Sequence, residues 1–109
     1  MEIPINLIVS ECFSKYADRS NFDITKTQES ISFEAIIPFW HDGARVSFYS
    51  EISITTEKEN ISYDDHMYDI KVIDLTMSNT VIHDNEGNVM NYSIPIEKIN
   101  KLLIQYIEQ

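Results

Sequence analysis

The chain has 109 residues, and eighteen aspartates and glutamates against eight lysines and arginines give it a net charge of −10 at pH 7. This charge excludes a strongly basic nucleic-acid binder, the single Cys12 excludes a disulfide scaffold, and the run Leu7–Val9 is too short to span a membrane. Glu2 also replaces the positive start of a signal peptide. We therefore expect one soluble, acidic, cytoplasmic domain over residues 1–109, with no direct contact to nucleic acid and no membrane segment.

Both ends of the chain show the spacing of amphipathic helices. Apolar residues recur at every third or fourth position there, so each set forms one stripe along a helix. A proline, Pro4 or Pro95, stands at each expected start, where its missing N–H costs nothing. We predict helices over about residues 4–18 and 95–107, each with its apolar stripe against another layer.

That layer is predicted to be an antiparallel sheet. The runs 31–40 and 44–55 alternate apolar and polar residues, and Asp42-Gly43 between them is typical of a two-residue hairpin turn. A turn there pairs His41 with Ala44. The same register pairs apolar residues four times on one face, namely Phe39 with Val46, Ile37 with Phe48, Phe33 with Ile52 and Ile31 with Ile54. A slip of one residue would set all four against polar partners, which specifies the register.

The opposite face of this hairpin is predicted to be mixed. The register pairs Trp40 with Arg45, Ile36 with Tyr49 and Glu34 with Glu51. The first pair suits a cation–π contact worth about 0.5–1 kcal/mol, whereas the last is unfavourable because like charges directly opposite repel. Pro38 cannot donate to a strand ladder, so its strand is expected at the edge of the sheet or with a bulge.

The sequence pattern of residues 57–92 predicts a loop and further strands. Residues 57–69 are polar and acidic and are interpreted as a loop, whereas 69–77 has the pattern of a strand. The apolar pattern of that strand changes phase between Val72 and Ile73, which a bulge or burial on both faces would explain.

A second hairpin is predicted from residues 80–83 and 88–92, with Gly87 at a turn position that needs positive φ. The sequence thus predicts a single α+β domain in the order α-β-β-β-β-β-α. Its antiparallel sheet has four to five strands flanked by N- and C-terminal helices.

Three short segments carry histidine and acidic side chains that could in principle bind a metal ion. Asp64, Asp65, His66 and Asp69 offer oxygens and one imidazole that suit Mg²⁺ or Mn²⁺, but their spacing matches no metal motif. The segments His41-Asp42 and His83–Asn88 are better explained as turns. Cys12 lies on an apolar stripe, where a buried thiol is inert. We expect no metal, no cofactor and no catalytic residue.

The negative charge is concentrated in one segment. Residues 57–86 carry eight acidic and two basic side chains, interleaved with Tyr63, Met67 and Tyr68. Acidic groups beside aromatic ones suit a protein partner with a basic surface, and they can imitate the phosphates of DNA. The alternative is that the acidity serves solubility alone.

The C-terminal part is similar in layout to small acidic accessory proteins of tailed phages and prophages. The features that carry the resemblance are Tyr63-Asp64-Asp65, the strand-like Asp69–Leu75, the turn at Gly87 and the closing helix Ile99–Tyr106. It covers residues 63–109 and implies a small α+β fold and a phage origin. Many such proteins inhibit host defence, including anti-CRISPR and anti-restriction proteins. The resemblance transfers no catalytic residue.

The sequence therefore favours a non-enzymatic inhibitor that blocks a basic, nucleic-acid-binding surface of a host defence protein. The predicted partner-binding residues are Glu57, Glu59, Tyr63, Asp64, Asp65, Tyr68 and Asp69. A secondary surface comprises Glu34, Ile36, Trp40, Arg45, Tyr49 and Glu51. The alternatives are an immunity protein or antitoxin that neutralises a basic toxin, a metal-dependent hydrolase that uses His66, and a structural role. A homodimer formed through the Pro38 edge and the Trp40 and Tyr49 face is also open.

Overall fold

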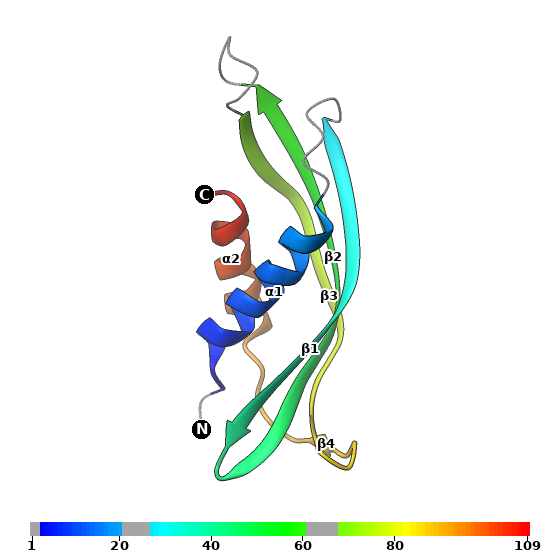
Figure 1. Ribbon diagram of the computed structural model, residues 1–109, viewed down its shortest axis with the longest axis vertical. Coiled ribbons are helices and arrows are strands. Elements are labelled where there is room, and N and C mark those ends of the chain that lie inside the picture. Colours follow the sequence, from blue (N-terminus) through cyan, green and yellow to red (C-terminus); the bar gives the residue numbers. More distant parts are fainter. Residues whose placement is uncertain (1–2, 21–26, 61–67) are drawn as a thin grey trace.

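The computed structural model, which describes residues 3–20, 27–60 and 68–109, has two helices packed on one face of a curved antiparallel sheet (Figure 1). The sheet has four strands in the order β1-β2-β3-β4. The molecule is elongated, with extents of 53 × 20 × 19 Å. Its elements are α1 (Ile5–Arg19), β1 (Gln28–His41), β2 (Ala44–Asn60), β3 (Tyr68–Asp84), β4 (Val89–Met90) and α2 (Ile96–Ile107). The predicted α+β class is confirmed.

The β1–β2 hairpin has the predicted turn and register. Asp42 and Gly43 both have positive φ, at 53° and 77°, as a type I′ turn requires. His41 pairs with Ala44. The four predicted apolar pairs and the three predicted pairs of the opposite face all occur in the ladder. Pro38 lies on an edge strand, as predicted.

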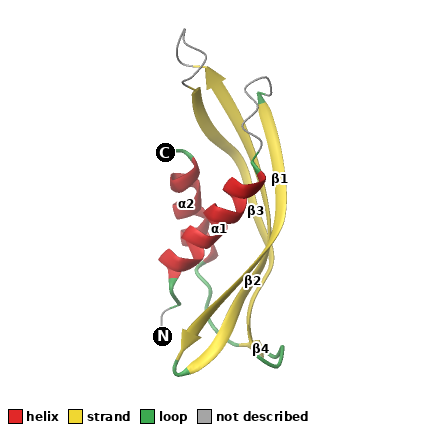
Figure 2. Ribbon diagram, in the orientation of Figure 1, coloured by secondary structure: helices red, strands yellow, loops and turns green. Residues whose placement is uncertain are grey.

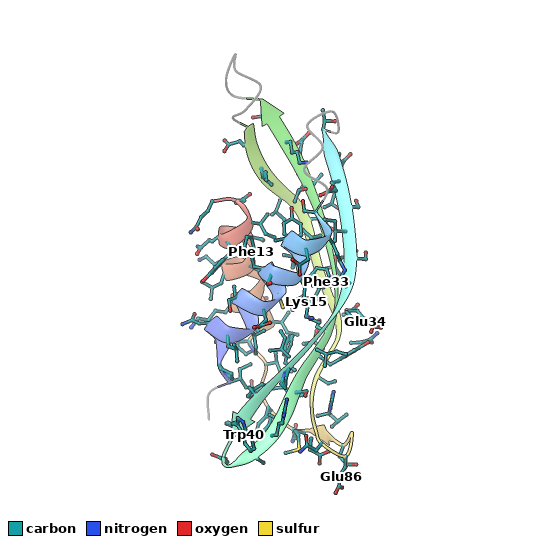
Figure 3. All side chains as sticks on the ribbon, viewed as in Figure 1. Phe13, Lys15, Phe33, Glu34, Trp40 and Glu86 are labelled. Atoms are coloured by element: carbon teal, nitrogen blue, oxygen red, sulfur yellow. The ribbon has the colours of Figure 1, made fainter. Side chains whose placement is uncertain are left out.

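The hydrophobic core lies between the sheet and the helices. The inward side chains of β1 and β2 alternate with exposed ones, and Figure 3 shows Phe33 on the helix side and Glu34 on the far side. The helices contribute Ile8, Val9, Cys12, Tyr16, Ile99, Leu103 and Ile107. Cys12 is fully buried in this core, as predicted, and burial raises the pKa of its thiol to about 12. No helix in the described part of the chain has the length and apolar character needed to cross a membrane.

Both helices begin after a proline in the same way. Pro4 and Pro95 have φ, ψ of −77°, 81° and −80°, 74°, and in each case the next amide donates to the carbonyl before the proline, at 2.9 Å. This geometry is an inverse γ-turn. The prolines therefore occupy the cap position, and the helices begin one residue later than predicted, at Ile5 and Ile96.

The prediction for residues 57–69 was wrong at both ends. β2 continues to Asn60 and β3 begins at Tyr68, because the two strands pair along the acidic segments as well. Residues 61–67 lie outside the described residues.

β3 is a single strand where the sequence indicated two. The register shifts between the pairs of Thr55 with Asp74 and Thr56 with Val72, which inserts Ile73 as the predicted bulge. A second shift lies at Asn79, whose φ is 52°. This second bulge joins residues 69–77 to residues 80–83, so the sheet has four strands rather than five.

The second predicted hairpin is present but short, because β4 has only two residues. Asp84 holds its turn: Oδ1 accepts hydrogen bonds from the backbone N–H groups of Glu86 and Asn88, both at 2.9 Å. The bond from Asn88 is the main cause that lowers the pKa of Asp84. Gly87 has φ of 85°, as predicted.

The two faces of β1 should respond differently to truncation. Ile37 is 2% exposed and its neighbour Ile36 is 52% exposed. Ile37→Ala should lower the free energy of unfolding by about 2–5 kcal/mol through cavity formation, whereas Ile36→Ala should change it by about 0.5 kcal/mol. Urea denaturation followed by circular dichroism measures both. Equal effects would contradict one-sided burial of the sheet.

Candidate functional site

The sheet face turned away from the helices, called the outer face, is not covered by any described element (Figure 2). It carries every second residue of the strands, namely those whose side chains point away from the helices. These are Ser30, Ser32, Glu34, Ile36, Pro38 and Trp40 of β1, Arg45, Ser47, Tyr49, Glu51, Ser53, Thr55, Glu57 and Glu59 of β2, and Asp69, Lys71, Asp74, Thr76 and Ser78 of β3. All six residues of the predicted secondary surface lie on it.

At one end of the outer face the structure brings together three of the predicted partner-binding residues. Glu57, Glu59 and Asp69 are exposed. With Lys71 they border a hollow of about 340 Å³ that extends around the β3 edge to Ile70 and Glu108 on the helix side. Glu59 lies directly opposite Asp69 in the ladder, and Glu57 lies opposite Lys71. This acidic end therefore combines one like-charge pair and one opposite-charge pair on regular strands, not on the predicted loop.

The other predicted partner-binding residues are not placed by the structure. Tyr63, Asp64 and Asp65 lie outside the described residues, as does His66. Tyr68 is the first residue of β3, with only its backbone described. Their roles stay predictions.

A second hollow lies in the middle of the outer face. It measures about 380 Å³ and is bordered by Glu34 and Glu51, which stand directly opposite each other, as predicted. Asn79 Nδ2 donates to Glu51 Oε2 at 2.7 Å, and Tyr49 Oη donates to Glu51 Oε1 at 3.4 Å. Neutral donors thus orient this carboxylate. Ser32, Phe33, Ile52, Ser53, Thr76 and Ser78 complete the lining.

The two carboxylates act on Tyr49. Desolvation is the largest cause that raises the pKa of this phenol above its ordinary value, and the negative charges of Glu34 and Glu51 raise it further. The carboxylates also accept hydrogen bonds from the phenol and thereby favour its neutral form. The phenol of Tyr49 therefore keeps its proton at neutral pH.

Large apolar side chains gather toward the hairpin end of the outer face. Trp40 is 72% exposed, Ile36 52% and Val89 69%. Trp40 lies opposite Arg45, as predicted, but the cation–π contact found among the described residues is that of Arg19, whose guanidinium lies 5.5 Å from the centre of the Phe33 ring. Trp40 thus keeps its indole open to a partner.

Hydroxyl pairs cross the strands between these charged and apolar groups. Ser30 bonds to Thr55 at 3.0 Å and Ser32 to Ser53 at 2.6 Å. No site role was predicted for these residues, although they occupy the alternating polar positions of both strands. Asn79 and Glu108 were also missed, and no local pattern marks either of them.

The described residues form no cluster of three or more histidine, cysteine, aspartate or glutamate side chains that could hold a metal ion. His41 is buried and packs edge-on against Tyr92, with ring centres 4.8 Å apart, so it is a core side chain at the end of the hairpin. No family model, no curated protein and no solved structure matches this chain. The outer face thus carries paired carboxylates in its middle and at one end, and exposed apolar side chains toward the hairpin end.

The tyrosine cluster predicts a measurable change in titration. Glu51→Gln should move the pKa of Tyr49 down toward its ordinary value, because one nearby negative charge is lost. The Tyr49 Cζ resonance in ¹³C-tyrosine-labelled protein, followed by NMR from pH 8 to pH 12, reports this value.

Glu97→Gln, on α2, serves as the matched control and should leave that resonance unchanged. The pKa of Tyr49 is higher in the folded protein than in the unfolded chain. The stabilisation linked to this shift is therefore present below pH 10.0 and is lost as the pH rises through the folded pKa. A Tyr49 titration identical in the wild type and Glu51→Gln would contradict the charge contact.

Proposed function

We propose that this protein is a non-enzymatic binding protein whose outer face docks onto a basic surface of a partner protein. The like-charge pairs of that face carry the proposal. Glu34 faces Glu51 and Glu59 faces Asp69 across neighbouring strands. Each arrangement costs the folded protein about 0.2–1 kcal/mol. A cationic partner would remove this repulsion, and local rules of stability are commonly broken at functional sites.

The apolar end of the outer face supports the same proposal. Protein interfaces are enriched in aromatic residues and depend on a few buried anchors. Trp40, at 72% exposure, has the largest side chain available for that purpose, and Ile36 lies four residues from it on the same face. An exposed aromatic side chain at one end of a face that also carries paired carboxylates fits a basic protein surface better than a small substrate.

The preferred partner is a protein that binds nucleic acid. Its basic surface is built to accept rows of phosphates, and the outer face offers rows of carboxylates on a long, regular support. Docking there would prevent nucleic acid from binding, as expected for an inhibitor of a host defence protein. A basic toxin is the second candidate partner, as expected for an immunity protein.

The test uses immobilised protein and a bacterial lysate. Captured proteins are identified by mass spectrometry, purified, and assayed for displacement of a fluorescein-labelled DNA duplex by the free chain. The double variant Glu59→Gln/Asp69→Asn should weaken capture by about fivefold or more at low salt, and raising the salt should weaken capture of the wild type.

The matched control removes two charges from the helix side. Glu11→Gln/Glu97→Gln has the same net charge as the outer-face variant, so it should retain capture and displacement. A partner whose capture ignored both salt and the outer-face variant would overturn the proposal. A partner that was captured while it kept its DNA would overturn the blocking role.

A further inference from the structure

β1 is the edge strand of the sheet, and one whole side of it pairs with no described element. In a two-residue hairpin the closing pair is hydrogen-bonded, and bonded pairs then occur at every second residue. The odd-numbered residues of β1 therefore bond to β2, as shown by Thr27, whose carbonyl accepts from Lys58 N–H at 2.8 Å just before the strand. The amides of Ser30, Ser32, Glu34 and Ile36 consequently face the open edge.

The two long edges of the sheet are protected unequally. Folded proteins commonly guard an exposed edge with bulges, prolines or covering groups. β3 has two bulges, and the Val72 N–H beside one of them donates to Glu108 Oε2 at 3.0 Å. β1 has an unbroken register from Gln28 to His41, with Pro38 as its one proline. The segment Ser30–Ile36 thus keeps regular donors and acceptors that no described strand or helix covers.

We propose that the open edge of β1 at Ser30–Ile36 pairs with an extended segment of a partner protein, which adds a strand to the sheet. The segment alternates basic residues, which point to the outer face, with apolar residues, which point to the helix side. The inference rests on the proposed function and specifies its mode: strand addition supplies backbone hydrogen bonds, and side-chain alternation supplies specificity.

The side chains on either side of the edge define this occupant. On the outer face, Glu34 stands beside the position of the added strand and opposite Glu51, so a lysine or arginine there relieves repulsion. On the helix side, the added strand meets Ile31 and Phe33, which are 8% and 7% exposed, and the Arg19 guanidinium over the Phe33 ring. That side accepts apolar side chains and disfavours cations.

A second copy of this chain is the poorer occupant. Each copy carries a net charge of −10, so two copies repel each other. Pro38 also closes the hairpin half of the edge, because its nitrogen faces the open side and has no proton to donate. The part of the β1 edge that can pair with an added strand is therefore limited to Ser30–Ile36.

The first experiment uses a ten-residue peptide of alternating lysine and valine with blocked ends. Amide hydrogen exchange by NMR should slow at Ser30, Ser32, Glu34 and Ile36 when this peptide is added. Two control peptides should give no such slowing: one with glutamate in place of lysine, and one of the same composition with all valines before all lysines. Protection confined to β3, or equal protection by the block peptide, would overturn the inference.

The second experiment compares two substitutions at one residue. Ser32→Ala removes the hydroxyl that bonds to Ser53 but keeps the edge amide, so peptide affinity should stay within about twofold. Ser32→Pro also removes the edge donor while it leaves the bonds to β2 in place, as Pro38 does in the same strand. It should weaken binding by about fivefold or more. Equal affinities of the two variants would overturn the inference.

Circular dichroism and thermal unfolding show whether Ser32→Pro is folded. If it is not, the exchange pattern of the wild-type chain decides the question. A lysate partner whose capture is weakened by Glu59→Gln/Asp69→Asn but not by Ser32→Pro contradicts strand addition. It does not contradict the proposed function. A partner whose capture is weakened by Ser32→Pro but not by charge removal or salt contradicts the proposed charge recognition. It leaves strand addition at the β1 edge supported.

Discussion

The register of the β1–β2 hairpin is the constraint on which the other features of this molecule depend. Asp42 and Gly43 hold a turn in which both residues have positive φ, and this turn makes His41 and Ala44 the closing pair. Because side chains alternate between the faces of a strand, a shift of one residue would exchange the buried and exposed sets. The same register decides which residues the helices cover and which amides of β1 reach the open edge.

Among the described residues, burial in this fold is confined to a single face of the sheet. The inward residues of β1, β2 and β3 meet α1 and α2 and supply the core. The outer face contributes less burial, so it tolerates pairs such as Glu34 with Glu51 that a core could not contain. Repulsion of this kind has a small cost at a solvated surface. A face under so few packing demands is free to specialise in recognition.

The unequal protection of the two sheet edges follows from the strands' different surroundings. β3 bends at Ile73 and Asn79, and the end of the chain reaches it through Glu108. The Asn79 bulge also positions the side-chain amide that donates to Glu51. This irregularity of β3 therefore helps to orient a carboxylate in the middle of the outer face. β1 is regular because every one of its residues from Gln28 to His41 has a partner in β2.

The sequence by itself determined the two helices, the hairpin turn and the register of β1 with β2, because each is set by short-range periodicity or turn chemistry. It also placed Glu57, Glu59 and Asp69 among the seven predicted partner-binding residues, on a segment interpreted as a loop. Only the tertiary structure decided that these acidic residues lie on paired strands, since acidic residues favour strands weakly and pairing between distant segments overrides that preference. It alone brought Asn79 to Glu51 and Glu108 to Val72. Those contacts join residues far apart in the chain, so no local pattern encodes them.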